Sequence, residues 1–424
     1  MDIPAITKPF DNYKWRWMEF TPVESFNRPD ILLGITRAIQ ACVGKSASSS
    51  EFIQRLEVIQ NDLLSDTSIK LVPKDTSRNV LRRQGRYWRG LGILDKQSTR
   101  QLKLTSLGVD YANGVITDDD FINRLINTHE LPNALIEDET TVQQWQSYGL
   151  NIKPLKLILE ILQKLSLKAS PQDTYLTPKE LAAVVIPLAI VSRDATYLAE
   201  AILDYRNTPT KYASLPNCTP EANDKRMVRE HLLILEYYGV LSRSLHTAVS
   251  NESERYYPLT IDSVTLDTSY VPPSDITDTD IDLSKQVPVY YRPEILRTKR
   301  NVSVTQRPNQ GAFRRAILAN FGNKCLLTGE VVRDVLVACH IHEVRDGGSD
   351  HHDNGILLRA DLHILFDKNK LRISEAGDVV FSPDISADSQ YHELIGRVQL
   401  PMSVNRDLLR RRFEYGRVVL PQTA

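Results

Sequence analysis

Histidine is concentrated in one short stretch of this sequence, residues 325–369. The chain of 424 residues has nine histidines, and five of them lie in this stretch: His340, His342, His351, His352 and His363. A neutral imidazole can accept a proton near pH 7 and can also bind a metal ion. Asp367 follows His363 by four residues, which would place both side chains on one face of a helix. The stretch therefore contains groups that could transfer a proton and groups that could hold a metal ion.

The hydrophobic pattern divides this stretch into elements that would position these groups. Residues 335–344 alternate and are rich in β-branched side chains, which predicts a strand. Residues 345–354 are mainly Gly, Asp, Ser and His, which predicts a polar loop. Residues 357–367 carry leucines and a phenylalanine at helical spacing. The predicted order is a strand, a loop, a second strand or extension, and a helix.

This arrangement resembles the HNH nuclease motif, also called the ββα-metal finger. The three name-giving residues would be His340 in the sequence ACHI, Asn354 in NGILL and His363 in RADLH. The flanking sequences resemble the HNH subgroup that is common among restriction endonucleases. These flanks are CLLTG at 325–329, HILFD at 363–367 and the preceding helix FRRAIL at 313–318.

The resemblance implies a role for each of these residues. Hydrolysis of a phosphodiester needs an activated water and a Lewis acid on the phosphate. In the family the first histidine is the general base, which implies that role for His340. The helix histidine binds a divalent metal, so His363 is the candidate ligand, with Asp367 as a second one. Asn354 would brace the loop and orient the base. The expected metal is Mg²⁺, with Mn²⁺ or Zn²⁺ as alternatives.

One position departs from the family pattern. Many HNH enzymes have Asp or His as a metal ligand just before the base, whereas this sequence has Cys339. A thiolate is a soft ligand that suits zinc better than magnesium, so Cys339 is a candidate ligand for zinc. The alternative is a buried thiol with a packing role. The additional histidines at 351 and 352 have no family role and are expected in a solvated loop, whereas His342 could support the site or touch DNA.

Composition places the chain among ordinary globular proteins. It is 42% hydrophobic and 25% charged, with a formal net charge of −1. No apolar run reaches the length of a membrane span, and the first 17 residues have no apolar signal core, so we expect a cytoplasmic protein. The four cysteines are scattered without a CxxC pair, which excludes a four-cysteine zinc knuckle.

The patterns along the chain predict an α+β protein with several domains. Three helical patterns followed by a strand, a turn and a strand look like the winged-helix modules of restriction enzymes and transcription regulators. A second helix, polar hairpin and strand near residue 241 repeat this plan. The predicted organisation is an N-terminal arm with a winged-helix-like module at 1–150, a second such module at 151–261, an acidic linker at 262–291 and a ββα-metal HNH domain at 292–424.

Basic residues cluster at the third helical pattern of the first module. The cluster comprises Arg78, Arg82, Arg83, Arg86 and Arg89, followed by Lys96, Arg100 and Lys103. Three of these arginines recur every four residues and share a face, as a helix that contacts DNA requires, although a solvated face is the alternative. Arg314 and Arg315 are also candidate DNA contacts. The C-terminal arginines are expected to neutralise phosphates beside the site: Arg406, Arg410, Arg411, Arg412 and Arg417.

These features predict a metal-dependent endonuclease of restriction type that cuts foreign double-stranded DNA with His340 as the base. One HNH domain cuts one strand, so a homodimer on DNA is expected. Two alternatives stay open. One is a nuclease that depends on DNA modification, and the other is a winged-helix regulator with an inactive HNH fold.

Overall fold

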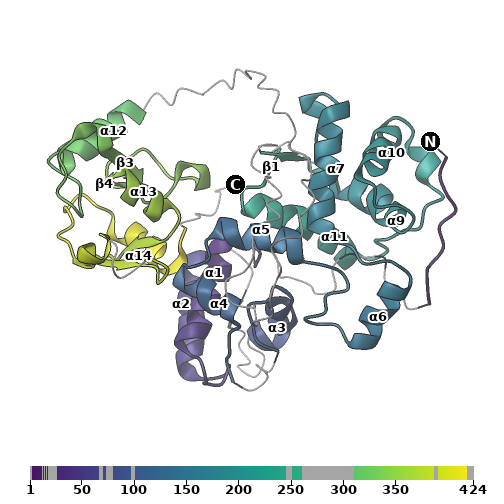
Figure 1. Cartoon of the computed structure of the whole chain (residues 1–424), viewed down its shortest axis with the longest axis horizontal. Coiled ribbons are helices and arrows are strands. Elements are labelled where there is room, and N and C mark those ends of the chain that lie inside the picture. The colour runs from purple at the N-terminus through teal and green to yellow at the C-terminus, as the bar shows by residue number, and fades with distance from the viewer. Residues whose placement is uncertain are drawn as a thin grey trace, which may run out of the picture.

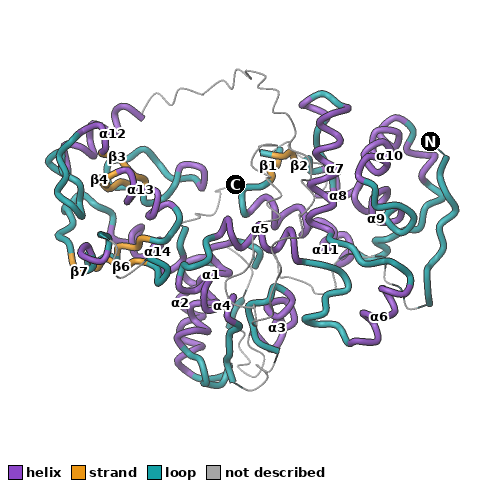
Figure 2. The backbone as a smooth tube through the Cα atoms, viewed as in Figure 1, coloured by secondary structure: helices purple, strands orange, loops and turns teal. Residues whose placement is uncertain are grey.

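The computed structural model of this protein describes most of the chain as two bodies (Figure 1). The described residues are 2–11, 13, 15, 17, 26–65, 70–72, 80–96, 101–244, 251–259, 310–385 and 390–417. Figure 2 shows a larger, mainly helical N-terminal body and a smaller C-terminal body that holds most of the strands. The predicted acidic linker at 262–291 lies outside the described residues. Within the described ranges, no helix combines the length and apolar character that crossing a membrane requires.

The first half of the N-terminal body contains six helices within its described residues. They are α1 Pro29–Ala41, α2 Ser50–Leu63, α3 Val80–Gly90, α4 Ser106–Asn113, α5 Asp118–Thr128 and α6 Glu139–Ser147. Helix α2 buries one apolar stripe, made of Phe52, Leu56, Ile59 and Leu63 at intervals of three or four residues. After α3, Leu94 and Leu104 form a single antiparallel bridge where a pair of strands was predicted. The winged-helix assignment of this half stays a prediction.

The second half of this body ends in a helix and a β-hairpin. Its elements are α7 Pro154–Lys168, η2 Pro171–Asp173, α8 Pro178–Glu180, η3 Leu181–Val185, α9 Ile186–Leu188, α10 Ala195–Asn207, η4 Pro209–Tyr212, α11 Ala222–Tyr237, β1 Leu241–Arg243, η5 Asn251–Ser253 and β2 Tyr256–Pro258. Thr177 and Glu180 form a reciprocal capping box at the start of α8, with a proline at the first helical turn.

Both halves of the N-terminal body share one hydrophobic core. Buried side chains from Tyr13 to Tyr256 form a continuous cluster, and α7 packs against both α5 and α10. Hydrophobic packing therefore runs across residue 150, where a boundary between two modules was predicted.

Two buried histidines in this core should make the stability of the body depend on pH. Burial, together with the nearby His231, lowers the pKa of His129 to about 3, and burial lowers the pKa of His231 to about 4. Below about pH 6.5 the unfolded chain therefore binds more protons than the folded one. The free energy of unfolding consequently decreases as the pH is lowered. Between pH 6.5 and 5 we expect a loss of about 2 kcal/mol for each histidine.

Urea unfolding at pH 7, 6 and 5 measures this dependence. In the His129→Gln variant, the decrease in the free energy of unfolding between pH 7 and 5 should be about half as large, because one of the two protonation sites is removed. An unchanged slope in that variant would show that other groups cause the acid sensitivity.

The C-terminal body has a β-hairpin, a small sheet and two longer helices. Its elements are α12 Gln310–Asn320, η6 Arg333–Val335, β3 Leu336–His340, η7 Val344–Asp346, β4 Gly355–Arg359, α13 Ala360–Asp367, β5 Leu371–Ile373, β6 Asp378–Phe381, η8 His392–Leu394, β7 Gly396–Arg397 and α14 Arg406–Tyr415. Strands β5, β6 and β7 form an antiparallel sheet in that order. This body has a hydrophobic core of its own.

Helix α14 joins the two bodies and lies beside α1 and α2 in Figure 1. The guanidinium of Arg410 donates to both carboxylate oxygens of Asp62 on α2, at 2.7 and 3.1 Å. The hydroxyl of Tyr415 donates to the same carboxylate at 2.6 Å. Arg37 on α1 donates in turn to the backbone carbonyl of Phe413 at 2.8 Å. The last helix of the C-terminal body is therefore fixed to the N-terminal body by charged hydrogen bonds.

Candidate active site

The candidate site is built on the β3–β4 hairpin and the helix that follows it. Strands β3 and β4 pair antiparallel, with His340 opposite Gly355. Helix α13 begins directly after β4, so the predicted order of strand, loop, strand and helix is confirmed. The first four residues of β3 have apolar side chains, and Leu336 and Cys339 are buried in the core. His340 therefore stands at the end of β3, where the polar loop begins.

His340 is held on two sides. Its Nε2 lies 3.0 Å from Oδ1 of Asp350 in the loop, and its side chain is 18% exposed. Its ring stacks on Phe313 of α12, with ring centroids 4.0 Å apart and planes 6° apart. An ionised carboxylate only accepts hydrogen bonds, so Asp350 favours the tautomer with the proton on Nε2. The lone pair then lies on Nδ1, which is the atom that could accept a proton from water.

Gly355 makes the close approach of Phe313 possible. A Cβ atom at this position would lie 2.6 Å from the Phe313 ring and 2.6 Å from Ile317. A side chain here would therefore displace the ring that stacks on His340.

Asn354 closes the loop between the two strands. Its Oδ1 accepts a hydrogen bond from the backbone N–H of His342 at 2.8 Å. Its Nδ2 donates to the carbonyls of His342 at 2.9 Å and Ser349 at 2.8 Å. The side chain is buried, so all three bonds form away from bulk water. These contacts tie the start of the loop to its end and thereby limit the movement of Asp350.

Removal of the Asn354 amide should destabilise the C-terminal body. We expect Asn354→Ala to lower the free energy of unfolding by about 3 kcal/mol, because a buried N–H and two carbonyls lose their partner. Urea unfolding measures the change. Asn320→Ala, at an exposed position on α12, is the matched control and should stay within about 0.5 kcal/mol of wild type. Equal effects of the two substitutions would contradict the bracing role.

His363 and Asp367 form a pair of possible metal donors on α13. The Nε2 of His363 lies 2.9 Å from Oδ2 of Asp367, and the side chains are 29% and 41% exposed. An imidazole and a carboxylate side by side fit a divalent cation that keeps several waters or phosphate oxygens as further ligands. Within the described ranges, no three His, Cys, Asp or Glu side chains converge on one point. The protein thus offers two adjacent donors here, with room for solvent and substrate.

Cys339 directly precedes His340 on β3. It is fully buried in the core of the C-terminal body, and its Sγ donates to the carbonyl of Val337 at 3.4 Å. Burial, with a smaller effect of the nearby Asp367 carboxylate, holds the pKa of the thiol well above its usual range. Its place in the core fits a packing role for Cys339. The alternative role of zinc ligand stays a prediction.

His342 is also buried, and it supports the loop. Its Nε2 lies 3.0 Å from the carbonyl of Asp346, and burial lowers the pKa of its ring. His351 and His352 are exposed in the loop, as predicted.

Comparison with known families agrees with this geometry. Residues 325–374 match the model of an HNH endonuclease family. This part of the chain is an HNH endonuclease domain.

A solved structure similar to this chain is the binding domain of the BpuJ1 endonuclease, in complex with pyrene- and phenanthrene-modified DNA. The two share 13% sequence identity, with a TM-score of 0.39, over 58% of this chain and 84% of that chain. The low score gives this likeness no weight in assigning a function. No curated protein matches the chain.

The predicted DNA-binding residues lie in different surroundings. Arg78 lies outside the described residues, and Arg82 and Arg83 are on α3, where the described side chains begin at Gly85. Arg86 donates to the carbonyl of Ile136 at 3.1 Å and pairs with Glu137, and Lys103 pairs with Asp95 at 3.3 Å. Arg89, also on α3, is half-buried. Helix α3 lies well apart from the hairpin of the HNH domain in Figure 1.

Arg314 and Arg315 precede the hairpin on α12. Arg314 donates to the carbonyls of Leu336 at 2.7 Å and Arg333 at 3.2 Å, so it holds α12 against β3. Arg315 is exposed.

The prediction that the C-terminal arginines neutralise phosphates is wrong for Arg412, which is buried. The guanidinium of Arg406 donates to the backbone carbonyls of Glu375 and Leu400, so it is held within the protein and is not assigned to phosphate contacts. Arg410 and Arg411 bind Asp62 and Asp407, and Arg417 binds Asp346 at 2.6 Å. These guanidinium groups are paired with protein carboxylates because α14 packs between the two bodies instead of lying on an open surface.

Sequence reasoning missed three residues around the site: Phe313, Asp350 and Arg412. Asp350 lies in the polar loop between the first histidine and the asparagine, and its place in that loop was the available signal. Phe313 was noted as part of a family-like helix, and Arg412 as one of a basic group, without a role in the site. Their contacts join segments distant in sequence, so no local pattern indicated them.

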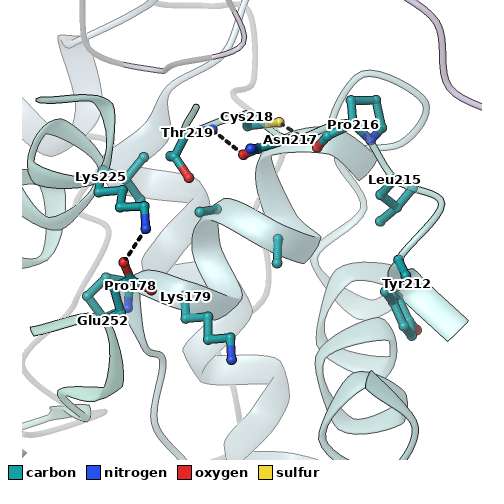
Figure 3. Close-up of a pocket in the computed structure, with 14 residues that line it drawn as sticks. Pro178, Lys179, Tyr212, Leu215, Pro216, Asn217, Cys218, Thr219, Lys225 and Glu252 are labelled. Carbon is teal, nitrogen blue, oxygen red and sulfur yellow. Dashed lines mark hydrogen bonds and ion pairs between the residues drawn. The ribbon is translucent and has the colours of Figure 1, made fainter. Parts of the chain in front are cut away.

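A separate cavity of about 290 Å³ lies in the N-terminal body, between α8, η3, η4 and α11 (Figure 3). Lys225 and Glu252 form an ion pair across one side of it, at 2.7 Å. Cys218 lines the cavity, but burial raises the pKa of its thiol to about 12, so it is not an activated nucleophile. The cavity is not part of the HNH domain.

Proposed function

We propose that this protein is a metal-dependent DNA endonuclease of restriction type that hydrolyses phosphodiester bonds in double-stranded DNA. The observation that carries the proposal is the setting of His340 in an HNH domain. Its ring is held by Asp350 and Phe313, and the donor pair His363 and Asp367 lies on the helix of the same motif.

The proposed reaction assigns one step to each group. His340 takes a proton from water through Nδ1, and the resulting hydroxide attacks the phosphorus in line with the departing 3′ oxygen. Asp350 stabilises the imidazolium that forms, because its carboxylate already lies against Nε2. The bond between phosphorus and the 3′ oxygen breaks and this oxygen takes a proton from solvent, which leaves a 5′-phosphate and a 3′-hydroxyl. A divalent ion held by His363 and Asp367, with Mg²⁺ first and Mn²⁺ or Zn²⁺ as alternatives, would supply Lewis-acid stabilisation of the phosphate.

DNA recognition is assigned in this proposal to the N-terminal body. The basic residues of α3 and the segments around it would contact the DNA backbone, with Arg82, Arg83 and Arg89 as the principal candidates and Arg78 and Lys103 beside them. Arg315 would contact DNA next to the HNH domain. Because one HNH domain cuts one strand, we propose that two copies of the chain act together on a duplex.

The test is cleavage of plasmid and phage DNA by the full chain with Mg²⁺, Mn²⁺, Zn²⁺ or EDTA. We expect discrete fragments with at least one of the metals and none with EDTA. The same plasmid from methylating and non-methylating hosts distinguishes cleavage of any DNA from cleavage that depends on modification. Binding in gel shifts without cutting under any metal would overturn the nuclease proposal in favour of a DNA-binding regulator.

A further inference from the structure

Arg412 on α14 contacts both halves of the HNH site. One guanidinium nitrogen donates to the carbonyl of Ile341 at 2.9 Å, and the other donates to the carbonyl of Phe366 at 3.0 Å. The guanidinium also lies over the Phe366 ring, 4.2 Å from its centroid. The residue is 3% exposed. A buried cation with two carbonyl partners and a stacked ring is held in one orientation.

The two carbonyls belong to the neighbours of the proposed functional residues. Ile341 directly follows His340 at the end of β3, and Phe366 directly precedes Asp367 at the end of α13. One planar group therefore bridges the strand that presents the base and the helix that presents the metal donors. The planar fork of an arginine can make both bonds at once, whereas the single ammonium of a lysine cannot reproduce that geometry.

The carboxylate of Asp367 lies between Arg412 and His363. Its Oδ1 is 3.7 Å from the Arg412 guanidinium, and its Oδ2 is 2.9 Å from His363 Nε2. Glu343, in the loop after β3, faces the other side of the guanidinium at 3.6 Å. The positive charge attracts Oδ1 and so keeps Oδ2 turned towards His363.

We propose that Arg412 is a positioning residue for the metal donors and the base of the HNH site. This inference rests on the proposed function. Arg412 lies outside the segment that matches the HNH family, residues 325–374. It sits on the helix that Asp62 fixes to the N-terminal body, so the site is completed by an element anchored to the part of the chain proposed to bind DNA.

Two variants of Arg412 and one control on the same helix test this role in the full chain. Arg412→Met removes the bridge, and Arg412→Lys retains the charge without the planar fork. Arg406→Met is the matched control, because Arg406 also donates to two carbonyls, of Glu375 at 2.7 Å and Leu400 at 3.0 Å, neither of which adjoins the proposed functional residues. The readouts are Mn²⁺ binding followed by electron paramagnetic resonance without DNA, the single-turnover cleavage rate at saturating Mn²⁺, and urea unfolding.

We expect Arg412→Met to weaken Mn²⁺ binding about 10- to 100-fold and to slow cleavage by a similar factor, as losses of residues that orient metal ligands generally do. Arg412→Lys should lie between Arg412→Met and wild type, and Arg406→Met should stay within about threefold of wild type in both measurements. If Arg412→Met does not fold, the comparison of Arg412→Lys with Arg406→Met decides the question.

Three results would overturn the proposal. The first is Mn²⁺ binding and cleavage by the Arg412 variants at the level of wild type, and the second is an equal loss in Arg406→Met. A wild-type protein that binds no Mn²⁺ at millimolar concentration also overturns it, because there is then no metal site to position. If wild type binds Mn²⁺ but cuts no DNA with any metal, the proposed function fails, whereas Mn²⁺ binding still tests the role of Arg412.

Discussion

Replacement of His340 by alanine is expected to slow DNA cleavage by about 10²- to 10⁴-fold, which is the usual contribution of a positioned general base. The imidazole lies between Asp350 and Phe313 in one orientation, so its removal takes away the one group that we propose as the base. The metal donors on α13 are untouched by this change. Mn²⁺ binding and DNA affinity should therefore remain within about threefold of wild type.

Single-turnover cleavage at saturating Mn²⁺ measures this effect, with gel shifts in EDTA for DNA affinity. His352→Ala is the matched control, because this histidine is exposed in the same loop and contacts neither the base nor the metal donors. It should retain the wild-type rate. A rate for His340→Ala near that of His352→Ala would remove His340 from the role of general base.

Replacement of His363 by alanine is expected to impair metal-dependent cleavage because a metal donor is lost, whereas His340→Ala removes the base. Asp367 would then be the single remaining donor of the pair, and a divalent ion held by one carboxylate is bound weakly. Lewis-acid stabilisation contributes several kcal/mol to phosphodiester hydrolysis, so the rate at low millimolar metal should fall by about 10³-fold or more. Part of the lost cleavage rate should be recovered at high metal concentration, because Asp367 can still bind the ion.

The two variants should differ most clearly in metal binding. His363→Ala should lose Mn²⁺ binding measured without DNA, whereas His340→Ala should retain it. Asp367→Asn should weaken Mn²⁺ binding in the same direction as His363→Ala, because the two donors lie 2.9 Å apart and would share the ion. Unchanged Mn²⁺ binding in His363→Ala would show that the metal is held elsewhere, and the assignment of the donor pair would be wrong.

The sequence by itself determined the elements of the site and their order. The alternation before His340, the polar loop, and the helical spacing after Leu357 are local patterns, and they correspond to β3, the loop, β4 and α13. The buried stripe of α2 and the capping box at Thr177 were predictable for the same reason. In each case, the residues that cause the structure are neighbours along the chain, so their spacing carries the information.

The tertiary structure alone decided which groups meet around these elements. Phe313 reaches His340 because α12 packs on the hairpin, and Gly355 leaves the space for its ring. Cys339 lies in the core of the C-terminal body, whereas the base, one residue further on, points to the opposite face of β3. A thiol before the base could be a ligand or a core residue, and its burial was not determined by its neighbours.

Arg412 is the clearest case of a role that the sequence could not determine. A group of C-terminal arginines has the same composition whether it faces DNA phosphates or protein carboxylates. The difference arises because α14 packs between the HNH domain and α2, where Asp62 and the carbonyls of Ile341 and Phe366 supply the partners. The carbonyls of Phe366 and Ile341 lie 46 and 71 residues from Arg412 along the chain, and Asp62 lies 348 residues from Arg410. Contacts of such separation depend on the packing of whole elements, and no local pattern records them.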